Sequence, residues 1–178
     1  MKTQVKMLQG VIKERDSPWS APAILVPKKN LDGKPKYRFC VDFRALNAVT
    51  KFNPYPLPAK DEAASTLFGS KYFSVLDCFS GFLQISIKED HRERTAFTVP
   101  SSHYEFTRLP FGLANSPSNF QRLMDTLLKN WLARSVIFIW AIVFSSTAEE
   151  HARRLEHVLQ RFDKANLVTS REMRYRAT

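Results

Sequence analysis

The chain has 178 residues, of which 44% are hydrophobic and 25% are charged, and its formal net charge is +10. This composition excludes a disordered chain, and the length allows one domain with a sizeable core or part of a larger one. The charge is uneven, because residues 1–51 contain 11 Lys and Arg against 4 Asp and Glu. Basic segments suggest a polyanion partner, nucleic acid first, and a solvated basic surface is the alternative.

The first 50 residues predict a helix followed by a hairpin. Residues 3–16 have the pattern of a short helix, broken or capped at Gly10, and the prolines of the loop after it exclude regular structure. Two strand-like runs, residues 23–29 and 35–41, flank an Asp-Gly pair, which is typical of a β-hairpin.

The next segment predicts a connector, a helix and a buried strand. Residues 53–58 ("NPYPLP") should be extended, because a residue before proline disfavours the helical region. Residues 59–69 read as a helix that ends at Gly69. Residues 71–77 ("KYFSVLD") are β-branched and aromatic, which favours a buried strand with Asp77 at its end.

A second hairpin and a helix follow. Strand-like residues 95–99 and 104–108 surround "PSSH" and predict the hairpin. Residues 116–133 predict a helix with Ser116 as its N-cap and Pro117 as its first residue. Its apolar positions recur at helical spacing: Phe120, Leu123, Met124, Leu127 and Leu128.

The remaining elements are an apolar run, a long helix and a tail. Val136–Phe144 contains nine apolar residues in a row, too few to span a bilayer, and predicts one uninterrupted buried strand. Residues 146–167 predict an amphipathic helix capped by Ser146 or Thr147, with Glu149 and Glu150 in its first turn. We expect its core face to contain Ala152, Leu155, Val158, Leu159 and Phe162, with His151 and His157 facing solvent. Residues after Leu167 have no clear pattern.

Interleaved strands and helices with hairpins predict an α+β fold with a mostly antiparallel sheet.

Cysteine usage and the N-terminus predict the cellular environment. Cys40 and Cys78 lack Cys-x-x-Cys spacing, so the sequence contains no zinc or redox motif, and buried reduced thiols are expected. The N-terminus has no signal-peptide core. We therefore expect an intracellular protein, cytoplasmic or nuclear, that is not secreted and has no membrane partner.

Four stretches taken together resemble a known family. "SPWSAPAILVPKK", "YRFCVDFRALN", "FSVLDCFSGFLQISI" and "LPFGLANSPSNFQRLMD" are similar in order, spacing and wording to the reverse transcriptases of gypsy-class LTR retrotransposons. The resemblance covers roughly residues 8–168. It implies a right-hand polymerase whose fingers occupy roughly residues 1–70 and whose palm occupies roughly residues 71–168, within a longer polyprotein. It also implies an RNA or DNA template-primer and a deoxynucleoside triphosphate as partners.

The resemblance implies a metal site at Asp77. Phosphoryl transfer uses two divalent ions, and Mg²⁺ prefers carboxylate oxygens, so acids must come from more than one strand. In the family, the first of these acids ends the strand "FSVLD", which makes Asp77 the catalytic metal ligand. The alternative is a helix-capping aspartate.

Further residues correspond to the family's nucleotide-binding site. Phe82 matches the steric gate that lies against the sugar, and an ordinary core aromatic is the alternative. Lys28, Lys29 and Arg38 flank the first hairpin, where family members hold the triphosphate, and the guanidinium of Arg38 offers a fork for phosphate oxygens.

Two other stretches, "LPFG" and "DFRALN", match motifs of the family. Phe111 should pack near the nucleotide and Gly112 should let the backbone approach the template; a simple helix entry is the alternative. Asp42 and Arg44 predict a local ion pair that supports the fingers.

The sequence departs from the family where the family has a Tyr-x-Asp-Asp turn. Anchoring on "VFSSTAEEH" without gaps places those four positions at residues 137–140, which read Ile-Phe-Ile-Trp. Asp77 alone cannot hold two ions, and Glu149 and Glu150 are better explained by the next helix. The family pattern ends near residue 168, and we expect the thumb, connection and ribonuclease H regions to be absent from the chain.

This departure leads to a prediction about activity and to alternative interpretations of the chain. The chain is predicted to be inactive as a polymerase, with Mg²⁺ binding lost. The alternatives to a working RNA-directed DNA polymerase are a non-catalytic nucleic-acid-binding or scaffold module and a decayed fragment with no selected role. A frame or splice error is a further hypothesis, because one shifted frame of codons for "FIWAI" can spell Tyr-Leu-Gly-Asp.

Overall fold

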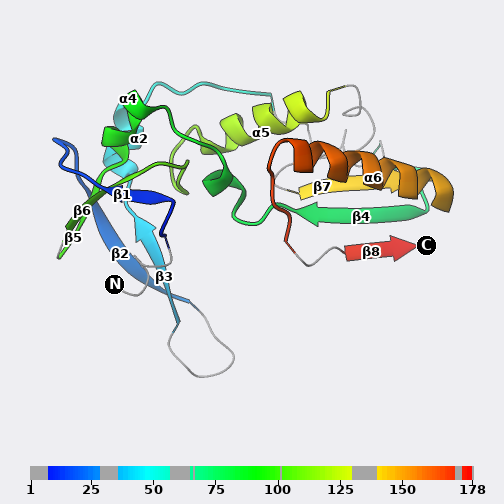
Figure 1. The fold of residues 1–178 in the computed structure, drawn as a ribbon, viewed down its shortest axis with the longest axis horizontal. Helices are drawn as coiled ribbons and strands as arrows, with labels where there is room; N and C mark the ends of the chain where they lie inside the picture. The colour runs from blue at the N-terminus through cyan, green and yellow to red at the C-terminus, as the bar shows by residue number, and fades with distance from the viewer. Residues whose placement is uncertain are drawn as a thin grey trace. The chain divides into compact units, whose positions relative to one another are not determined.

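The computed structural model describes residues 8–28, 36–56, 65, 67–100, 102–129, 140–170 and 174–177. The chain divides into two compact units (Figure 1). Unit 1 is built from residues 1–52 and 85–116, and unit 2 from residues 53–84 and 117–178. Both units combine strands with helices, so the α+β prediction is confirmed. Among the described helices, none has the length and apolar character needed to span a membrane.

Unit 1 contains a five-stranded sheet within its described residues, in the order β1-β6-β5-β2-β3. Neighbouring strands are antiparallel, except that β2 and β5 pair in parallel. Both predicted hairpins are confirmed as the pairs β2–β3 and β5–β6; residues 29–35 of the first turn lie outside the description. The strands are β1 (Ile12–Glu14), β2 (Ala21–Lys28), β3 (Lys36–Val41), β5 (Phe97–Val99) and β6 (Ser102–Phe106).

The predicted helix over residues 3–16 is wrong in its described part. Gly10 lies in a turn with φ of +84°, and strand β1 follows it. Ile12 pairs with Phe106 of β6, and both side chains contribute to the core of unit 1. Pairing with a distant strand therefore overrides the local helical pattern. Residues 3–7 lie outside the described part.

Aromatic side chains fill the core of unit 1. Phe97 packs against Phe106 with ring centroids 5.2 Å apart, and Phe43 contacts Phe106 edge-on at 6.3 Å. The described part of unit 1 also contains three short helical segments: α2 (Arg44–Val49), α4 (Glu89–Arg92) and η2 (Glu93–Thr95). The sequence did not predict them, because segments of three to six residues are too short to show a helical period.

Unit 2 is built around strand β4 (Tyr72–Asp77), which confirms the predicted buried strand. It is the central strand of an antiparallel sheet, between β7 (Trp140–Ser145) and β8 (Arg174–Ala177). Strand β8 lies in the tail, for which the sequence showed no clear pattern. Of the apolar run, Trp140–Phe144 lies within β7, and residues 136–139 are outside the described part.

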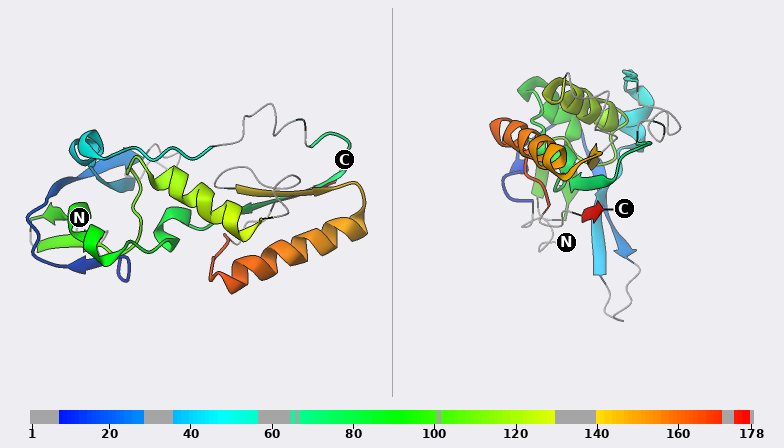
Figure 2. Two further views of the ribbon diagram at one scale, coloured as in Figure 1. Left: turned by 90° about the horizontal axis from the view of Figure 1, so that it is seen from above. Right: turned by 90° about the vertical axis from the view of Figure 1, so that its right-hand side faces the viewer.

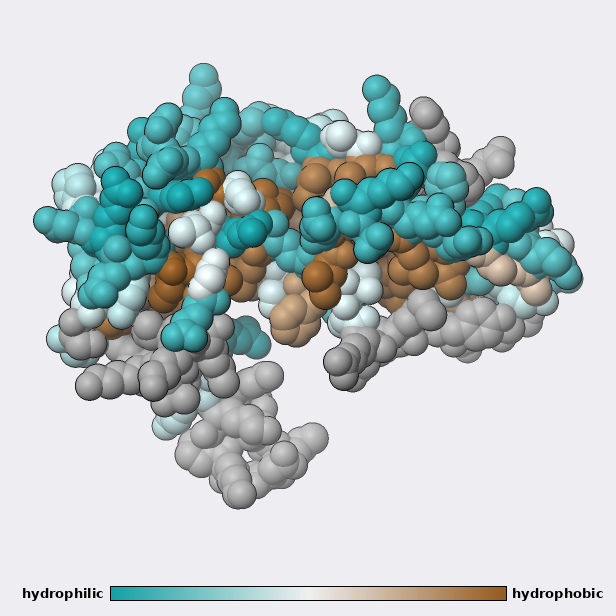
Figure 3. Space-filling model, viewed as in Figure 1, coloured by the Kyte–Doolittle hydropathy of each residue, from teal (hydrophilic) through white to brown (hydrophobic). Residues whose placement is uncertain are grey.

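Helix α6 (Ala148–Lys164) runs along β7, as Figures 1 and 2 show. Thr147 is its N-cap and accepts from the backbone N–H of Glu150, so the predicted cap is confirmed. The predicted core face is partly wrong: Ala152 and Leu159 are exposed, and His151 is buried. In Figure 3 the outer side of α6 is hydrophilic, with hydrophobic residues of the sheet beside it.

Helix α5 (Ser116–Leu127) buries its predicted apolar positions Phe120 and Met124. It begins at Ser116 itself, whose hydroxyl donates to the Pro110 carbonyl, so Pro117 is the second helical residue and not the first. Residues 53–56 have no regular structure, as predicted. The predicted helix over residues 59–69 lies mostly outside the described residues.

Candidate active site

Asp77 is the last residue of the central strand β4 and is half-buried. Side chains alternate along a strand, and Ser74 on β4 contacts His151 of α6. Asp77 therefore projects from the face of the sheet opposite to α6. Its own carbonyl accepts from the backbone N–H of Ser170 at 2.6 Å, which ties the chain after α6 to the end of β4.

The register of β4 and β7 places Trp140 directly opposite Asp77. Trp140 is the residue that the gapless anchoring assigns to the last position of the family's turn, where an aspartate is expected. The other three positions, residues 137–139, lie outside the described part. The residue paired with Asp77 is thus a tryptophan, and a tryptophan side chain contains no oxygen that could bind a metal ion.

The described residues contain no group of three or more His, Cys, Asp or Glu side chains placed to hold a metal ion. Glu149 and Glu150 occupy the first turn of α6, as predicted, and Glu150 forms a 2.6 Å ion pair with Arg154. A two-ion site needs several hard oxygen ligands in one place. The described side chains do not fit such a site around Asp77.

Phe82 lies in a short helical turn, η1 (Gly81–Gln84), five residues after Asp77. Its ring is 7% exposed and meets the ring of Phe120 edge-on, with centroids 5.8 Å apart. Gly81 allows this packing, because a Cβ there would lie 2.8 Å from Phe120 Cε2. Within unit 2, Phe82 is therefore a core aromatic attached to α5.

Cys78 follows Asp77 and is a buried free thiol, as predicted, and Cys40 is a half-buried free thiol. Burial, and then the adjacent Asp77 charge, raise the pKa of Cys78 to about 11. The thiol therefore stays protonated at neutral pH and is a poor nucleophile or metal ligand.

Gln84 is a positioning residue that the sequence interpretation missed. Its Nε2 donates to the carbonyls of Phe79 at 2.7 Å and Val168 at 2.8 Å, and its Oε1 accepts from the Val168 N–H at 2.7 Å. One side chain thus joins the segment after Asp77 to the segment after α6. No local sequence pattern could predict this contact, because Gln84 and Val168 are 84 residues apart.

The predicted triphosphate ligands belong to unit 1. Lys28 is the last residue of β2 and pairs in register with Lys36, while Lys29 lies outside the described residues. Arg38 is exposed on β3 opposite Val26. Strand β3 is at one edge of the five-stranded sheet, so the guanidinium of Arg38 is accessible to a solute.

Phe111 and Gly112 lie in the loop before α5. Phe111 is 55% exposed, and Gly112 has φ of +93°, a conformation that favours glycine. Asn47, another residue that the sequence interpretation missed, fixes the loop: its Nδ2 donates to the Gly112 carbonyl at 2.8 Å, and its Oδ1 accepts from the Ala114 N–H at 2.9 Å.

The predicted ion pair between Asp42 and Arg44 is confirmed. Arg44 Nη2 lies 2.6 Å from Asp42 Oδ2, and Arg44 Nε contacts both carboxylate oxygens. Hydrogen bonds from the Arg44 side chain and backbone lower the pKa of Asp42 to about 2. The pair is exposed, so we expect it to orient the start of α2 more than it stabilises the fold.

The candidate residues fall into two groups. Asp77 and Phe82 belong to unit 2, whereas Lys28, Arg38, Phe111 and Gly112 belong to unit 1. Each group is well defined within its own unit. Unit 2 supplies a carboxylate at a strand end, and unit 1 supplies a cation and a loop with an exposed ring.

Known proteins resemble the chain over most of its length. A family described as reverse transcriptase (RNA-dependent DNA polymerase) matches residues 26–172. The Pol polyprotein of transposon opus from Drosophila melanogaster is 41% identical over 167 residues, which are 92% of this chain and 17% of that protein. The Pol polyprotein of transposon gypsy from the same organism is 38% identical, over 95% of this chain and 17% of its own length. The chain thus spans less than a fifth of either polyprotein.

Solved structures agree with these relatives. A foamy viral protease-reverse transcriptase in complex with an RNA/DNA hybrid is 30% identical with a TM-score of 0.84, covering 95% of this chain and 22% of that one. A second foamy viral structure, in complex with double-stranded DNA, has a TM-score of 0.81 at 30% identity and covers 92% of this chain and 28% of that one. This similarity confirms the predicted fold class.

Proposed function

The chain belongs to the reverse transcriptase (RNA-dependent DNA polymerase) family, and we propose that it is a fingers–palm domain of a retrotransposon polyprotein that does not polymerise DNA by itself. The fingers would occupy roughly residues 1–70 and the palm roughly residues 71–168. One observation carries the proposal: Trp140 pairs in register with Asp77 on the neighbouring strand. The gapless anchoring on "VFSSTAEEH" assigns Trp140 to the position of a catalytic aspartate.

The chemistry of the reaction supports this proposal. Reverse transcriptases use Mg²⁺ to activate the primer hydroxyl and to neutralise the triphosphate, which requires carboxylates from both strands of the site. In this chain β4 supplies Asp77, and β7 begins with Trp140. Glu150 is engaged with Arg154 and is unsuited to replace the missing ligand. We infer that two-ion binding is lost.

The nucleotide-binding residues keep their proposed roles. In unit 1, Arg38 with Lys28 or Lys29 would hold the triphosphate, Phe111 would pack near the nucleotide, and Gly112 would let the backbone approach the template. In unit 2, Phe82 would act as the steric gate against the sugar. The exposure of Arg38 and Phe111 supports these assignments. Phe82 is 7% exposed, so little of its side chain is available to contact a sugar.

Primer extension tests the proposal directly. The chain is mixed with an RNA template, a DNA primer, all four deoxynucleotides and Mg²⁺, and no extension is expected. A restored variant, Ile137→Tyr with Ile139→Asp and Trp140→Asp, is expected to bind Mg²⁺ measurably by calorimetry, and adding Asp77→Asn to it should abolish that binding. Mg²⁺-dependent extension by the unmodified chain would overturn the proposal.

A second candidate function is intracellular, non-catalytic binding of nucleic acid. The 11 Lys and Arg residues among the first 51 favour it, as do the foamy viral relatives solved with hybrid and double-stranded DNA. Such binding should tolerate any sequence and weaken steeply with salt. Arg38→Ala should weaken the binding of template-primer, whereas a decayed fragment without a role would bind equally poorly with or without Arg38.

A further inference from the structure

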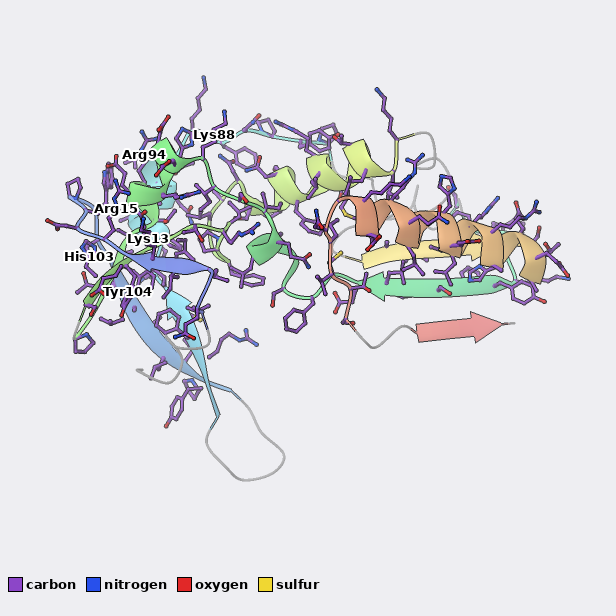
Figure 4. The ribbon with its side chains drawn as sticks, in the orientation of Figure 1. Lys13, Arg15, Lys88, Arg94, His103 and Tyr104 are labelled. Atoms are coloured by element: carbon purple, nitrogen blue, oxygen red, sulfur yellow. The ribbon has the colours of Figure 1, made fainter. Side chains whose placement is uncertain are left out.

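Strands β1 and β6 carry polar side chains on the face of their sheet that is turned away from the core. Ile12 and Phe106 pair in register and enter the core, so their neighbours Lys13 and Glu105, which also pair, lie on the other face. His103 shares that face, two residues before Glu105 on β6. Figure 4 shows Lys13 and His103 on these neighbouring strands.

Hydrogen bonds connect this face to the chain after β1. The Arg15 N–H donates to the His103 carbonyl at 3.2 Å, and His103 Nε2 lies 3.0 Å from the carbonyl oxygen of Trp19. The indole of Trp19 is 41% exposed. Ser17 Oγ donates to the Glu93 carbonyl at 2.9 Å, which places the next residue, Arg94, beside the same loop.

The charges of this face are mixed: its cations are exposed to solvent, whereas one of its acids, Glu105, is buried. Glu105 is 2% exposed, and Arg15 Nη1 lies 3.9 Å from its carboxylate. Lys13 and Arg94 are exposed. Asp16 and Glu93 are exposed acids of the same segments, so the face attracts a polyanion through a few local contacts and not through a long-range field.

Exposed aromatic rings among cations are the features that bind single-stranded nucleic acid, because bases stack on the rings while phosphates contact the cations. Trp19 and the half-buried His103 supply the rings. Tyr104 does not, because it stacks on Phe97 on the core side with centroids 5.8 Å apart. Duplex nucleic acid offers no unstacked base to such rings.

We propose that Lys13, Arg15, Trp19, Arg94 and His103, named here the β1 face, form a second contact surface for single-stranded RNA or DNA. The inference rests on the proposed nucleic-acid-binding function. It is a separate surface, since β1 and β3, the strand of Arg38, are the two opposite edges of the five-stranded sheet. The β1 face holds a single-stranded stretch of RNA or DNA while the β2–β3 hairpin contacts the template-primer.

Two variants of the full chain test the β1 face, with binding of a labelled 20-nucleotide single-stranded RNA followed by fluorescence anisotropy at several salt concentrations. Lys13→Gln with Arg94→Gln removes two phosphate contacts, so the slope of log affinity against log salt should become shallower by about 1.4. Trp19→Ser removes one stacked base and should weaken binding about 5- to 150-fold. Arg15 is kept, because it lies beside the buried Glu105 carboxylate.

Matched controls come from exposed residues of unit 2. Arg153→Gln with Lys164→Gln on α6 makes the same change in net charge, and Phe68→Ser removes a ring that is 94% exposed. Both should bind RNA as the unmodified chain does. Thermal unfolding confirms that each variant is folded.

The possible outcomes separate this inference from the proposed function. If the β1-face variants match their controls while Arg38→Ala weakens template-primer binding, the β1 face is not a binding surface and the proposed function stands. If Trp19→Ser has no effect, or if duplex DNA responds as single-stranded RNA does, the single-strand assignment is overturned. Primer extension is not a readout here, so the state of the metal site does not affect the result.

Discussion

Ser74 Oγ and His151 Nε2 lie 2.8 Å apart in the interior of unit 2, where they join the central strand β4 to α6. Ser74 is fully buried and His151 is 4% exposed. The ring of Tyr72 lies next to the imidazole, with centroids 6.2 Å apart. A polar pair inside a sheet–helix interface is stabilising only while both groups keep their hydrogen bond.

The buried histidine predicts that unit 2 loses stability in mild acid. Burial, and then the neighbouring Arg154 charge, lower the pKa of His151 below its ordinary value of 6.5. The unfolded chain therefore binds this proton at a higher pH than the folded chain does. The stability that the neutral imidazole contributes is fully present above pH 6.5 and is lost as the pH falls from 6.5 through the folded pKa. Urea unfolding between pH 5 and 8 measures this loss.

Variants of the pair identify the source of the pH dependence. His151→Leu should remove the pH dependence and cost about 1–3 kcal/mol at pH 7.5, because Ser74 loses its imidazole partner. Adding Ser74→Ala should recover part of that cost, since both polar groups are then replaced. His91→Gln, at an exposed position of α4, is the control and should leave the profile unchanged. An unchanged profile in His151→Leu would assign the titration to another group.

A close approach at Gly81 predicts a second effect on stability. A Cβ there would lie 2.8 Å from Cε2 and 3.0 Å from Cζ of Phe120, a ring that is 2% exposed and cannot move away freely. Gly81→Ala should therefore destabilise unit 2 by about 1–3 kcal/mol, which is the usual cost of overpacking. Chemical denaturation measures this difference.

The double variant Gly81→Ala with Phe120→Leu distinguishes steric crowding from a backbone effect. The smaller Leu side chain makes room for the methyl group, so the two changes should cost less together than the sum of their separate costs. Strict additivity would mean that the methyl group does not meet the ring.

The sequence predicted most of the fold because its long elements carry strong local patterns. Strand β4, both hairpins and helices α5 and α6 follow from alternation, helical spacing and the Thr147 cap. The failures share a physical cause. Strand β1 lies in a segment with a helical pattern, and β8 lies in one with no clear pattern. Both strands form because they pair with distant strands, β6 and β4.

The candidate site shows the same contrast between residues in recognisable local patterns and residues defined by contacts with distant segments. Asp77 and Arg38 were named as candidates because they lie in stretches that resemble a family. Asp77 ends strand β4, and Arg38 lies within β3. Asn47 and Gln84 were missed, since each joins segments 65 or 84 residues apart through its amide group. His151 was assigned to solvent, but a helix face is decided by the sheet that it packs on, and Ser74 gives this imidazole a buried partner.

Arg161 predicts a third effect, because it closes the end of α5 from the neighbouring helix. Its Nη1 donates to the carbonyl of Leu127, the last residue of α5, at 2.7 Å, and to that of Lys129, two residues beyond the helix, at 3.3 Å. The last carbonyls of a helix have no partner within the helix. A cation there also opposes the negative end of the helix dipole. Arg161→Ala should destabilise unit 2 by about 1–3 kcal/mol, measured by thermal and urea unfolding.

Two control variants test the role of the guanidinium. Arg161→Lys, which keeps the charge with a single ammonium group, should recover part of this loss. Arg153→Ala, at an exposed position of α6, should cost less than about 0.5 kcal/mol. Equal losses in Arg161→Ala and Arg153→Ala would show that the contact with α5 contributes nothing specific.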